Sequence, residues 1–413
     1  MEDKTKIVFL LDSLKRGGVQ NGVLLQSSNI DKTKYDIEVW ALRSNDQNWE
    51  YASAFKEQAV SISPVPVKHY TDTKGIIKLA EKLSKEKIVI LNTESFYPNI
   101  VGRIAAYLAE TPIVIVNYHS TYKHRWNPKY IAYEKMLRDI TDNFVCVSGA
   151  VEDYLTPLLN LPKNKLYKLY NCVDIEKYII NEPKNSIREK LSLPLDTPIV
   201  AMIGRLTKVK NIPLLFKALP EIKKEIPNIK AVLVGDGEDR QQLEKEVDEK
   251  NLRDTVIFMG SREDVPMILN AVDCIALPSE VEGFPRVLLE AFAAKTPLIA
   301  TPAGGIAEIL KDGINGLLIP FSDSQSLADA VKKTLLEKED TLKRCEMAFD
   351  DVQEFSLKNW INQTEELFDK LIDQNKSEIE KYLNTEKQIS NLSMKIKLLK
   401  FRAKFNLHRF FYK

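Results

Sequence analysis

Two glutamates, Glu282 and Glu290, frame the expected start of a helix in the second half of the chain. Proline is favoured in the first turn of a helix, so the helix is expected to begin near Pro285, with Glu290 in its second turn. The free N–H groups of a helix start bind anionic groups such as phosphate, and carboxylates accept hydrogen bonds from hydroxyl groups. A sugar nucleotide carries both kinds of group. The alternative is that the two carboxylates only compensate the helix dipole.

Cations follow a predicted strand at residues 199–203. The loop that comes next contains Arg205, Lys208 and Lys210. Ligands of parallel sheets bind at the carboxyl ends of strands, where a guanidinium fork and an ammonium group suit phosphate oxygens. We expect Lys208 to be solvated and Arg205 and Lys210 to contact a diphosphate.

The glycine pair Gly17-Gly18 follows the first predicted strand and opens a helix. Glycines there let an anionic ligand approach the backbone, although a tight turn explains them as well. A dinucleotide fingerprint requires Gly-x-Gly-x-x-Gly, and after Gly235-Asp236-Gly237 the third position is Arg240. The chain also contains no Walker A lysine loop. These absences argue against a nicotinamide cofactor and a P-loop.

The elements that must position these residues alternate between strands and helices. In the first half we expect strands at residues 6–11, 36–42, 88–91, 113–116 and 144–147, separated by helices at 19–30, 76–85, 99–109 and 131–140. In the second half we expect strands at 199–203, 231–234, 256–259, 274–277 and 298–300, and helices at 213–225, 238–250, 265–270 and 286–294. This alternation predicts the α/β class, with two doubly wound Rossmann-like domains.

The expected domains are residues 1–180 and 181–354, joined at a polar, proline-containing stretch and facing each other across a cleft. An amphipathic helix at 355–372 is expected to return to the body. Residues 373–413 are expected to form a basic amphipathic tail.

Composition restricts the class of protein. The 413 residues are 44% hydrophobic and 28% charged, as in ordinary soluble proteins, and the net charge of +1 argues against a chain built mainly to bind nucleic acid. The four cysteines are widely spaced, which favours a reducing compartment and argues against a zinc ribbon. No apolar run approaches the ~20 residues of a membrane span or the length of a signal peptide. We therefore expect an intracellular protein that does not cross a bilayer.

The tail departs from the rest of the chain in charge. From residue 391 onward it has seven cations and no acid, so the remainder of the chain is net acidic. Taken as a helix, it places Leu392, Ile396, Leu399, Ala403, Leu407 and Phe410 on one side, and Phe401, Phe405, Phe411 and Tyr412 add aromatic bulk. This pattern predicts a helix lying on an anionic membrane surface. The alternatives are a helix packed on the acidic body and a solvated chain end.

Taken together and in this order, the motifs resemble the retaining glycosyltransferases of family 4, which have the GT-B fold. The likeness rests on the pair Glu282-x7-Glu290, the basic loop at 204–211 and Gly235-Asp236-Gly237. Supporting matches are Val145-Cys146-Val147-Ser148, Asp273 with Pro278-Ser279, Thr301-Pro302-Ala303-Gly304-Gly305 with Glu308, and residues 312–318. The resemblance covers residues 6–371.

The resemblance implies a role for each matching residue. Arg205 and Lys210 would hold the diphosphate of a nucleotide-diphosphate sugar, and Glu290 would bond the ribose. Glu282, with the backbone amides of Gly283 and Phe284, would hold the donor sugar. From the acceptor-side N-terminal domain, Gly17 and Gly18 would border the phosphates and His119 would lie near the sugar. The nucleotide base would lie near Gly260, Ser261 and Arg262.

Two positions depart from the family pattern. Gln20 and Asn21 stand where the family commonly has an acidic residue, and Cys172 replaces a glycine before the interdomain linker. Neither departure removes a phosphate ligand, so they concern the acceptor side more than the donor side.

The resemblance implies a hexosyltransferase that acts with retention of configuration in bacterial capsular, exopolysaccharide or glycolipid synthesis. Its acceptor would be a glycan or lipid-linked glycan at the inner face of the cell membrane. The chain contains no Asp-x-Asp, so we expect no metal and no cofactor. Two alternatives are a catalytically silent sugar-nucleotide-binding assembly protein and an epimerase of the same fold; the intact glutamate pair argues against the epimerase.

Overall fold

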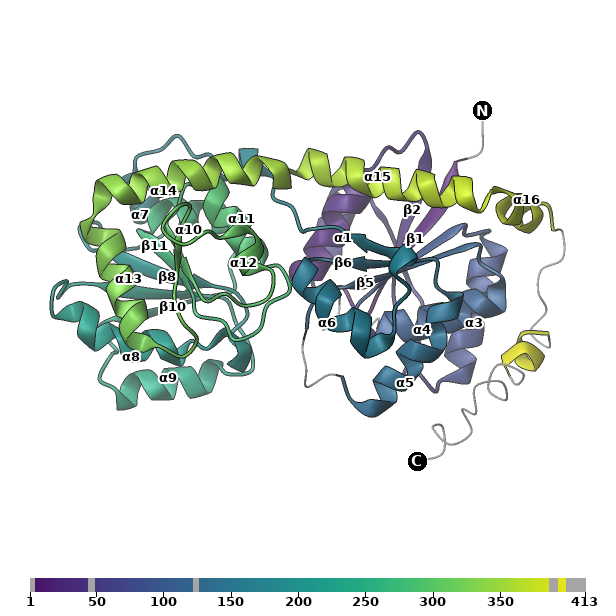
Figure 1. Cartoon of the computed structure of the whole chain (residues 1–413), viewed down its shortest axis with the longest axis horizontal. Helices are drawn as coiled ribbons and strands as arrows, with labels where there is room; N and C mark the ends of the chain where they lie inside the picture. The colour runs from purple at the N-terminus through teal and green to yellow at the C-terminus, as the bar shows by residue number, and fades with distance from the viewer. Residues whose placement is uncertain (1–3, 44–48, 122–125, 386–392, 399–413) are drawn as a thin grey trace. The chain divides into compact units, whose positions relative to one another are not determined.

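The computed structural model describes residues 4–43, 49–121, 126–385 and 393–398. The chain divides into two compact units (Figure 1). The first contains Met1–Leu169 together with Ile361–Lys413, and the second contains Tyr170–Trp360. The division thus falls earlier than the expected boundary at residue 180. It also passes through helix α15 (Leu357–Gln374), the predicted returning helix, most of which belongs to the first unit.

The first unit is built on a seven-stranded parallel sheet in the order β3-β2-β1-β4-β5-β6-β7. Its strands are β1 (Thr5–Leu11), β2 (Tyr35–Ala41), β3 (Ser61–Pro64), β4 (Ile90–Glu94), β5 (Ile113–Tyr118), β6 (Asn143–Cys146) and β7 (Leu166–Lys168). The helices are α1 (Gly18–Asn29), α2 (Ala52–Glu57), α3 (Thr73–Lys85), α4 (Phe96–Ala109), α5 (Pro128–Leu137), α6 (Gly149–Leu159) and α16 (Lys376–Asn384).

Strand β1 shows why this sheet is covered on both faces. Its apolar run is continuous, and successive side chains of a strand point to opposite faces. Val8 and Leu10 pack into the core formed with α3 and α4, whereas the ring of Phe9 lies 6.5 Å from that of Phe368 in α15. Helix α15 therefore completes the second face of the first sheet, which α1 also covers (Figure 1).

The second unit contains a six-stranded parallel sheet in the order β10-β9-β8-β11-β12-β13. Its strands are β8 (Ile199–Ile203), β9 (Lys230–Val234), β10 (Val256–Gly260), β11 (Cys274–Leu277), β12 (Leu298–Ala300) and β13 (Leu317–Leu318). The helices are α7 (Lys184–Lys190), α8 (Pro213–Lys223), α9 (Arg240–Glu249), α10 (Val265–Ala271), α11 (Arg286–Ala293), α12 (Ile306–Ile309), α13 (Ser324–Leu336) and α14 (Lys338–Asp351).

Each sheet has one point where the strand order reverses. In the first unit this point lies between β1 and β4, and in the second it lies between β8 and β11. Open α/β sheets bind ligands in the crevice outside the carboxyl ends of the strands at such a point. Strand β4 ends at Glu94, and the loops that follow the other three strands contain Gly17-Gly18, Arg205 with Lys210, and Glu282. The topology thus predicts that these residues lie where ligands bind.

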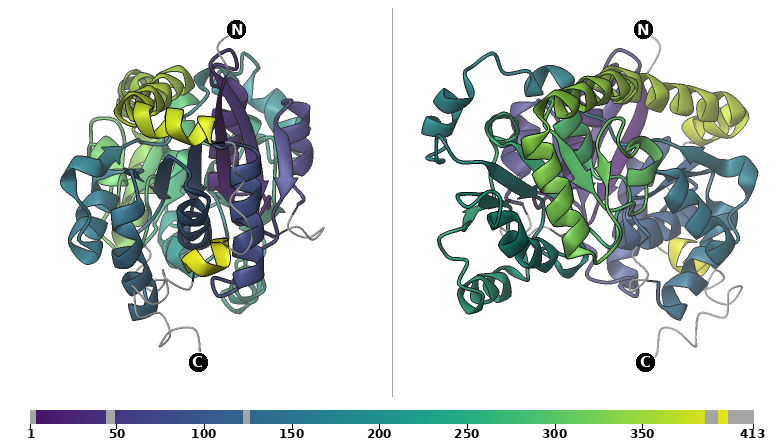
Figure 2. Two further views of the ribbon diagram at one scale, coloured as in Figure 1. Left: turned by 90° about the vertical axis from the view of Figure 1, so that its right-hand side faces the viewer. Right: turned by 60° about the vertical axis from the view of Figure 1, so that its left-hand side comes forward.

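The segment at residues 393–398 is helical and packs on the first unit. Met394 and Leu398 are buried in the core that includes α3 and α4, whereas Ile396 is 45% exposed. Figure 2 shows this short helix, in yellow, beside the blue helices of the same unit. For these six residues the packed alternative therefore applies, with Ile396 on the outer side. The other residues of the predicted tail stripe, Leu392, Leu399, Ala403, Leu407 and Phe410, lie outside the described residues, as do the aromatic residues Phe401, Phe405, Phe411 and Tyr412.

Within the described ranges, no helix has the length and apolarity needed to span a membrane.

Candidate functional site

In the second unit, the structure brings a predicted phosphate ligand and a predicted sugar ligand together. The Nζ of Lys210 lies 2.6 Å from Oε1 of Glu282, and the two side chains are only 17% and 8% exposed. Lys210 ends a short 3-10 helix, Lys208–Lys210, after β8, and Glu282 follows the neighbouring strand β11. Arg205 and Lys208 are exposed on the same loop. Two cations, Arg205 and Lys210, and the carboxylate of Glu282 thus lie at the switch point of the second sheet.

The Gly235-Asp236-Gly237 motif supports this basic loop. A Cβ on Gly235, whose φ is +132°, would lie 2.0 Å from the carbonyl oxygen of Gly204. A Cβ on Gly237 would lie 2.3 Å from the carbonyl oxygen of Leu206. Both positions require glycine because the two loops touch backbone to backbone. The motif therefore fixes the loop that contains Arg205.

Backbone contacts also hold the Glu282-Gly283-Phe284 segment. Gly305 donates its N–H to the carbonyl of Gly283 at 2.8 Å, and a Cβ on Gly304 would lie 2.0 Å from the carbonyl oxygen of Glu282. Phe284 is buried, with its ring 4.9 Å from that of Tyr170. Since the Phe284 ring is held in the core, only the backbone of Phe284 remains for a ligand.

Helix α11 begins at Arg286, directly after Pro285, as the sequence predicts. Within the described part of the chain, no side chain caps its first turn. Its backbone N–H groups can therefore serve an anion.

Glu290, on the second turn of α11, has a partner that sequence analysis did not identify. The hydroxyl of Tyr178, at the end of the 3-10 helix Ile175–Tyr178, donates a hydrogen bond to its carboxylate. Burial raises the pKa of Glu290, and the nearby Arg286 and the Tyr178 bond oppose that rise. The sequence did not predict this contact, because Tyr178 and Glu290 are far apart in the chain and only the fold brings them together.

The departure at Cys172 is accommodated without strain. Cys172 is buried and is not among the described residues with positive φ, so a side chain fits where the family pattern has glycine. Arg286 donates to its carbonyl at 3.1 Å.

Arg262, expected near the nucleotide base, follows β10. Its guanidinium forms two hydrogen bonds with Asp264, at 2.8 Å and 2.5 Å. This bidentate contact fixes the direction of the guanidinium plane. The pKa of Asp264 is lowered by the bond.

In the first unit, Gly17 and Gly18 stand at the start of α1. Gly17 is extended, with φ −177°, and a Cβ on Gly18 would have no atom within 4 Å. Turn strain therefore does not explain Gly17, and crowding does not explain Gly18. In the described residues, α1 has neither a side-chain cap nor an acidic residue in its first turn. Gln20, at one departing position, donates to the carbonyl of Ser13 at 3.2 Å.

His119 follows β5 and forms a close pair with Glu94 within the first unit. Its Nε2 lies 2.6 Å from Oε2 of Glu94, the last residue of β4. The Glu94 side chain is 3% exposed and that of His119 is 24% exposed. Sequence analysis missed Glu94 because it ended this strand at residue 91, whereas β4 extends to Glu94. The signal in the sequence was a carboxylate, Glu94, close after one predicted strand, while His119 follows the next strand along the chain.

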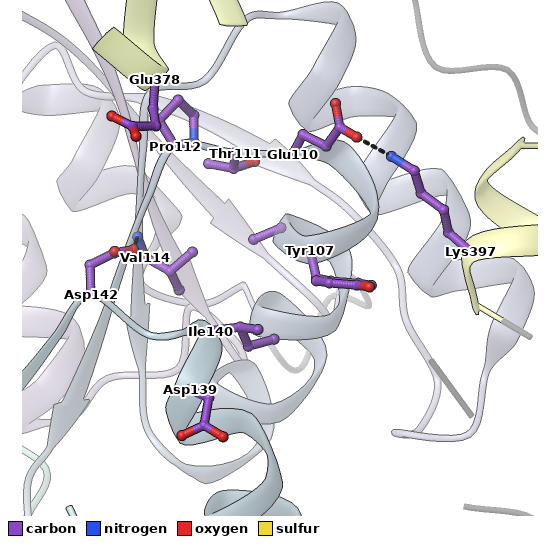
Figure 3. A pocket seen from close by; sticks show the side chains of 11 residues that line it. Tyr107, Glu110, Thr111, Pro112, Val114, Asp139, Ile140, Asp142, Glu378 and Lys397 are labelled. Carbon is purple, nitrogen blue, oxygen red and sulfur yellow. Dashed lines mark hydrogen bonds and ion pairs between the residues drawn. The ribbon is translucent and has the colours of Figure 1, made fainter. Parts of the chain in front are cut away.

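A cavity of about 420 Å³ lies in the first unit, beside the end of α4 and the start of β5 (Figure 3). Thr111, Pro112 and Asp142 line it just before β5 and β6 begin, so it lies at the opposite edge of the sheet from His119. Burial raises the pKa of Asp142. Lys397 of the 393–398 helix forms an ion pair with Glu110 at its rim. The cavity therefore lies beside the helical segment 393–398, and none of the predicted site residues lines it.

Comparison with known proteins identifies the family. The model for Glycosyltransferase Family 4 matches residues 16–177, and the model for Glycosyl transferases group 1 matches residues 183–348. A UDP-Gal:alpha-D-GlcNAc-diphosphoundecaprenol alpha-1,3-galactosyltransferase of Escherichia coli is 32% identical over 277 residues, which cover 65% of this chain and 71% of the relative. This chain belongs to the group 1/family 4 glycosyltransferases. An N-acetyl-alpha-D-glucosaminyl L-malate synthase of Bacillus anthracis is 27% identical to this glycosyltransferase over 63% of the chain and 69% of the relative.

Solved structures confirm the fold of this glycosyltransferase. Anabaena HepE in complex with UDP and glucose superimposes with a TM-score of 0.80 at 20% identity, covering 89% of this chain and all of that one. Sucrose-phosphate synthase from Thermosynechococcus elongatus gives a TM-score of 0.75, also at 20% identity, over 90% of this chain and all of that one. The predicted GT-B architecture of two parallel-sheet domains is therefore confirmed.

Proposed function

We propose that this glycosyltransferase moves a hexose from a nucleotide-diphosphate sugar to a lipid-linked glycan, with retention of configuration, in bacterial surface polysaccharide or glycolipid synthesis. The observation that carries the proposal is the Lys210–Glu282 pair at the switch point of the second sheet, with Arg205 on the same loop. One side of this arrangement suits a diphosphate and the other suits sugar hydroxyls.

In this proposal the second unit binds the donor. Arg205, Lys210 and the N–H groups at the start of α11 hold the diphosphate and stabilise the charge that develops on it as it leaves. Preorganised charges of this kind usually supply the largest catalytic contribution, and loss of one donor group typically costs about 100- to 1,000-fold in rate. Glu282 with the Gly283 and Phe284 amides holds the sugar, Glu290 the ribose, and the Arg262 region the base. No metal is required in this scheme, because cations of the protein offset the leaving charge.

The first unit contributes the start of α1 at Gly17-Gly18 and the His119 side chain. We assign the acceptor to this unit. The galactosyltransferase relative carries a diphosphoundecaprenol acceptor in its name, which supports a lipid-linked glycan as acceptor for this chain.

The tail supports a location at the inner face of the membrane. Lys395 and Lys397 belong to the helical segment 393–398, on which Ile396 faces outward, and five further cations follow in the sequence. Each cation near an anionic surface contributes ~1 kcal/mol of binding free energy. In this arrangement Met394 and Leu398 fasten the segment to the body, and the opposite side meets the lipid.

The competing function is a catalytically silent sugar-nucleotide-binding protein. The conjunction of Arg205, Lys210, Glu282 and Glu290 argues against it, because binding alone does not require all four. The test is incubation of the full chain with a panel of nucleotide sugars, with and without a synthetic lipid-diphosphate-linked sugar. We expect slow donor hydrolysis alone, faster transfer with the acceptor, and an anomeric proton coupling in the product that matches the donor. Donor binding without release of nucleotide would establish the silent alternative, and an inverted anomer would contradict retention.

A further inference from the structure

We propose that Glu94 is the positioning residue for His119: it accepts a hydrogen bond from the Nε2–H of the imidazole and so leaves Nδ1 to accept a hydrogen bond from a hydroxyl of the substrate. The inference rests on the proposed transfer reaction. It adds a residue of the first unit that the sequence motifs did not indicate.

The contact itself is close and sheltered. Oε2 of Glu94 lies 2.6 Å from Nε2 of His119, and the carboxylate is 3% exposed. An ionised carboxylate only accepts hydrogen bonds, so the ring nitrogen that faces it must carry a proton. A neutral imidazole then has its lone pair on Nδ1. The tautomer of a histidine is set in this way by the bond that its other nitrogen makes.

The backbone aims Glu94 at this position. Strands β4 and β5 are neighbours with Glu94 opposite Asn117, so residues at the ends of both strands emerge at one edge of the sheet. Ser95, which follows, has φ +76° and ψ 171°, a conformation that is essentially restricted to glycine. Strain of this kind persists where the surrounding structure fixes the backbone, and it clusters at functional sites.

A buried polar network supplies that fixation beneath the pair. Asn99 of α4 is 1% exposed; its side chain accepts from the Thr93 hydroxyl at 2.8 Å and donates to the Asn117 carbonyl at 3.1 Å. The amide of Asn117 donates in turn to the Thr93 carbonyl at 3.1 Å. Thr93 directly precedes Glu94, so these bonds lock the end of β4 to the end of β5.

A second set of bonds holds the residue before His119. The hydroxyl of Tyr118 donates to Oε2 of Glu134 at 2.6 Å, and the same oxygen lies 2.5 Å from Nη2 of Arg103. Arg103 and Glu134 are 0% and 1% exposed, and Nε of Arg103 donates to the Asn99 carbonyl at 2.6 Å. A fully buried ion pair repays its desolvation poorly as a source of stability. Its use here is to fix the two strand ends that present Glu94 and His119.

The test reads the tautomer directly, on the full chain labelled with 15N-histidine. The chain has four histidines, and His119→Asn identifies the signals of His119 by their loss. At a pH where the ring is neutral, we expect wild-type His119 to show a protonated Nε2 and an unprotonated Nδ1. In Glu94→Gln, whose amide can also donate to Nε2, and in Glu94→Ala, we expect a mixture of tautomers. Glu57→Gln, an exposed glutamate of α2, should leave the spectrum unchanged.

A double-mutant cycle tests whether Glu94 acts through His119. We expect Glu94→Gln to lower kcat by about tenfold to a hundredfold, the scale of one hydrogen bond to a charged group. Combined with His119→Asn, it should cause no further loss. A wild-type ring protonated on Nδ1, the same tautomer in all Glu94 variants, or additive losses in the cycle would overturn the inference. The spectral readout does not depend on turnover, so an inactive protein would count against the proposed function and leave this test intact.

Discussion

The ammonium group of Lys210 and the carboxylate of Glu282 form a largely buried ion pair at the switch point of the second sheet, 2.6 Å apart. We assign the first group to the donor's phosphates and the second to its sugar. Without a donor, the two charges neutralise each other. The Lys210 ammonium group is therefore in place before a donor binds, and it leaves no unbalanced charge at the site. Because the two groups are paired, removal of either one should lower the stability of the fold as well as remove that residue's own ligand contact.

Replacing the two phosphate ligands should abolish transfer, but with different effects on the fold. Charge-assisted bonds contribute ~1.5–3 kcal/mol each, so Arg205→Ala and Lys210→Ala should each lower kcat/KM by at least about tenfold. Arg205 is exposed, so its loss should leave the Tm unchanged, whereas Lys210→Ala leaves Glu282 unpaired and should lower it. Lys208→Ala, on the same loop, is the matched control. Near-normal turnover in the double variant Arg205→Ala/Lys210→Ala would show that the phosphate site lies elsewhere.

The two glutamates should separate in a binding experiment. Glu290→Ala should weaken binding of a free nucleoside diphosphate, because the ribose contact is lost. Glu282→Ala should change that affinity little, yet lower turnover and the discrimination between donor sugars. Calorimetry with nucleoside diphosphate alone distinguishes the two variants. An equal loss of affinity in both would contradict the assignment.

The raised pKa of Glu290 predicts the sign of a pH effect. Its folded-state pKa lies above the ordinary value, so the folded protein binds this proton more tightly than the unfolded chain does. The resulting stabilisation is present below the unfolded pKa and is lost as the pH rises through the folded pKa. Glu290→Gln keeps an acceptor for the Tyr178 hydroxyl and removes the buried charge. We therefore expect a higher Tm than wild type at pH 7, and a difference that shrinks on acidification.

Thermal unfolding across this pH range provides the measurement. Glu280→Gln, an exposed neighbour, should show no such pH-dependent difference in Tm. A Tm of Glu290→Gln below that of wild type at pH 7 would show that the ionised form is the stabilised one.

The residues that we propose as ligands in the second unit were more predictable from sequence than those in the first unit, for a physical reason. Residues 274–277 and the helix start after Pro285 were found because apolar runs and proline act locally. Strand β4 was misplaced because its last residues, Asn92, Thr93 and Glu94, are polar and yet buried. Asn117 bonds Asn92, Asn99 bonds Thr93 and His119 bonds Glu94, and all three partners come from elsewhere in the chain. Side-chain pairs such as Tyr178 with Glu290 are likewise set by the fold.

Activity should not depend on an added metal. Arg205 and Lys210 supply positive charge beside the proposed diphosphate position, and the chain has no Asp-x-Asp. We expect full transfer in the presence of EDTA, measured as nucleotide release after exhaustive dialysis against the chelator. Complete loss that Mn²⁺ or Mg²⁺ restores would overturn this expectation.

The proposed membrane role of the tail can be tested without disturbing the body. Ending the chain at Asn391 would remove Met394 and Leu398 from the core and so confuse binding with unfolding. A chain ending at Leu398 keeps both residues and removes Lys400, Arg402, Lys404, Arg409 and Lys413. At ~1 kcal/mol for each cation, its partition onto vesicles of anionic lipid should fall by more than tenfold. Ile396→Asp, an exposed substitution, should weaken flotation with an unchanged Tm, whereas Leu383→Asp, exposed on α16, is the matched control for an added charge. Flotation of all forms to the same extent, or flotation that is insensitive to salt and to removal of the anionic lipid, would show that the tail serves the body alone.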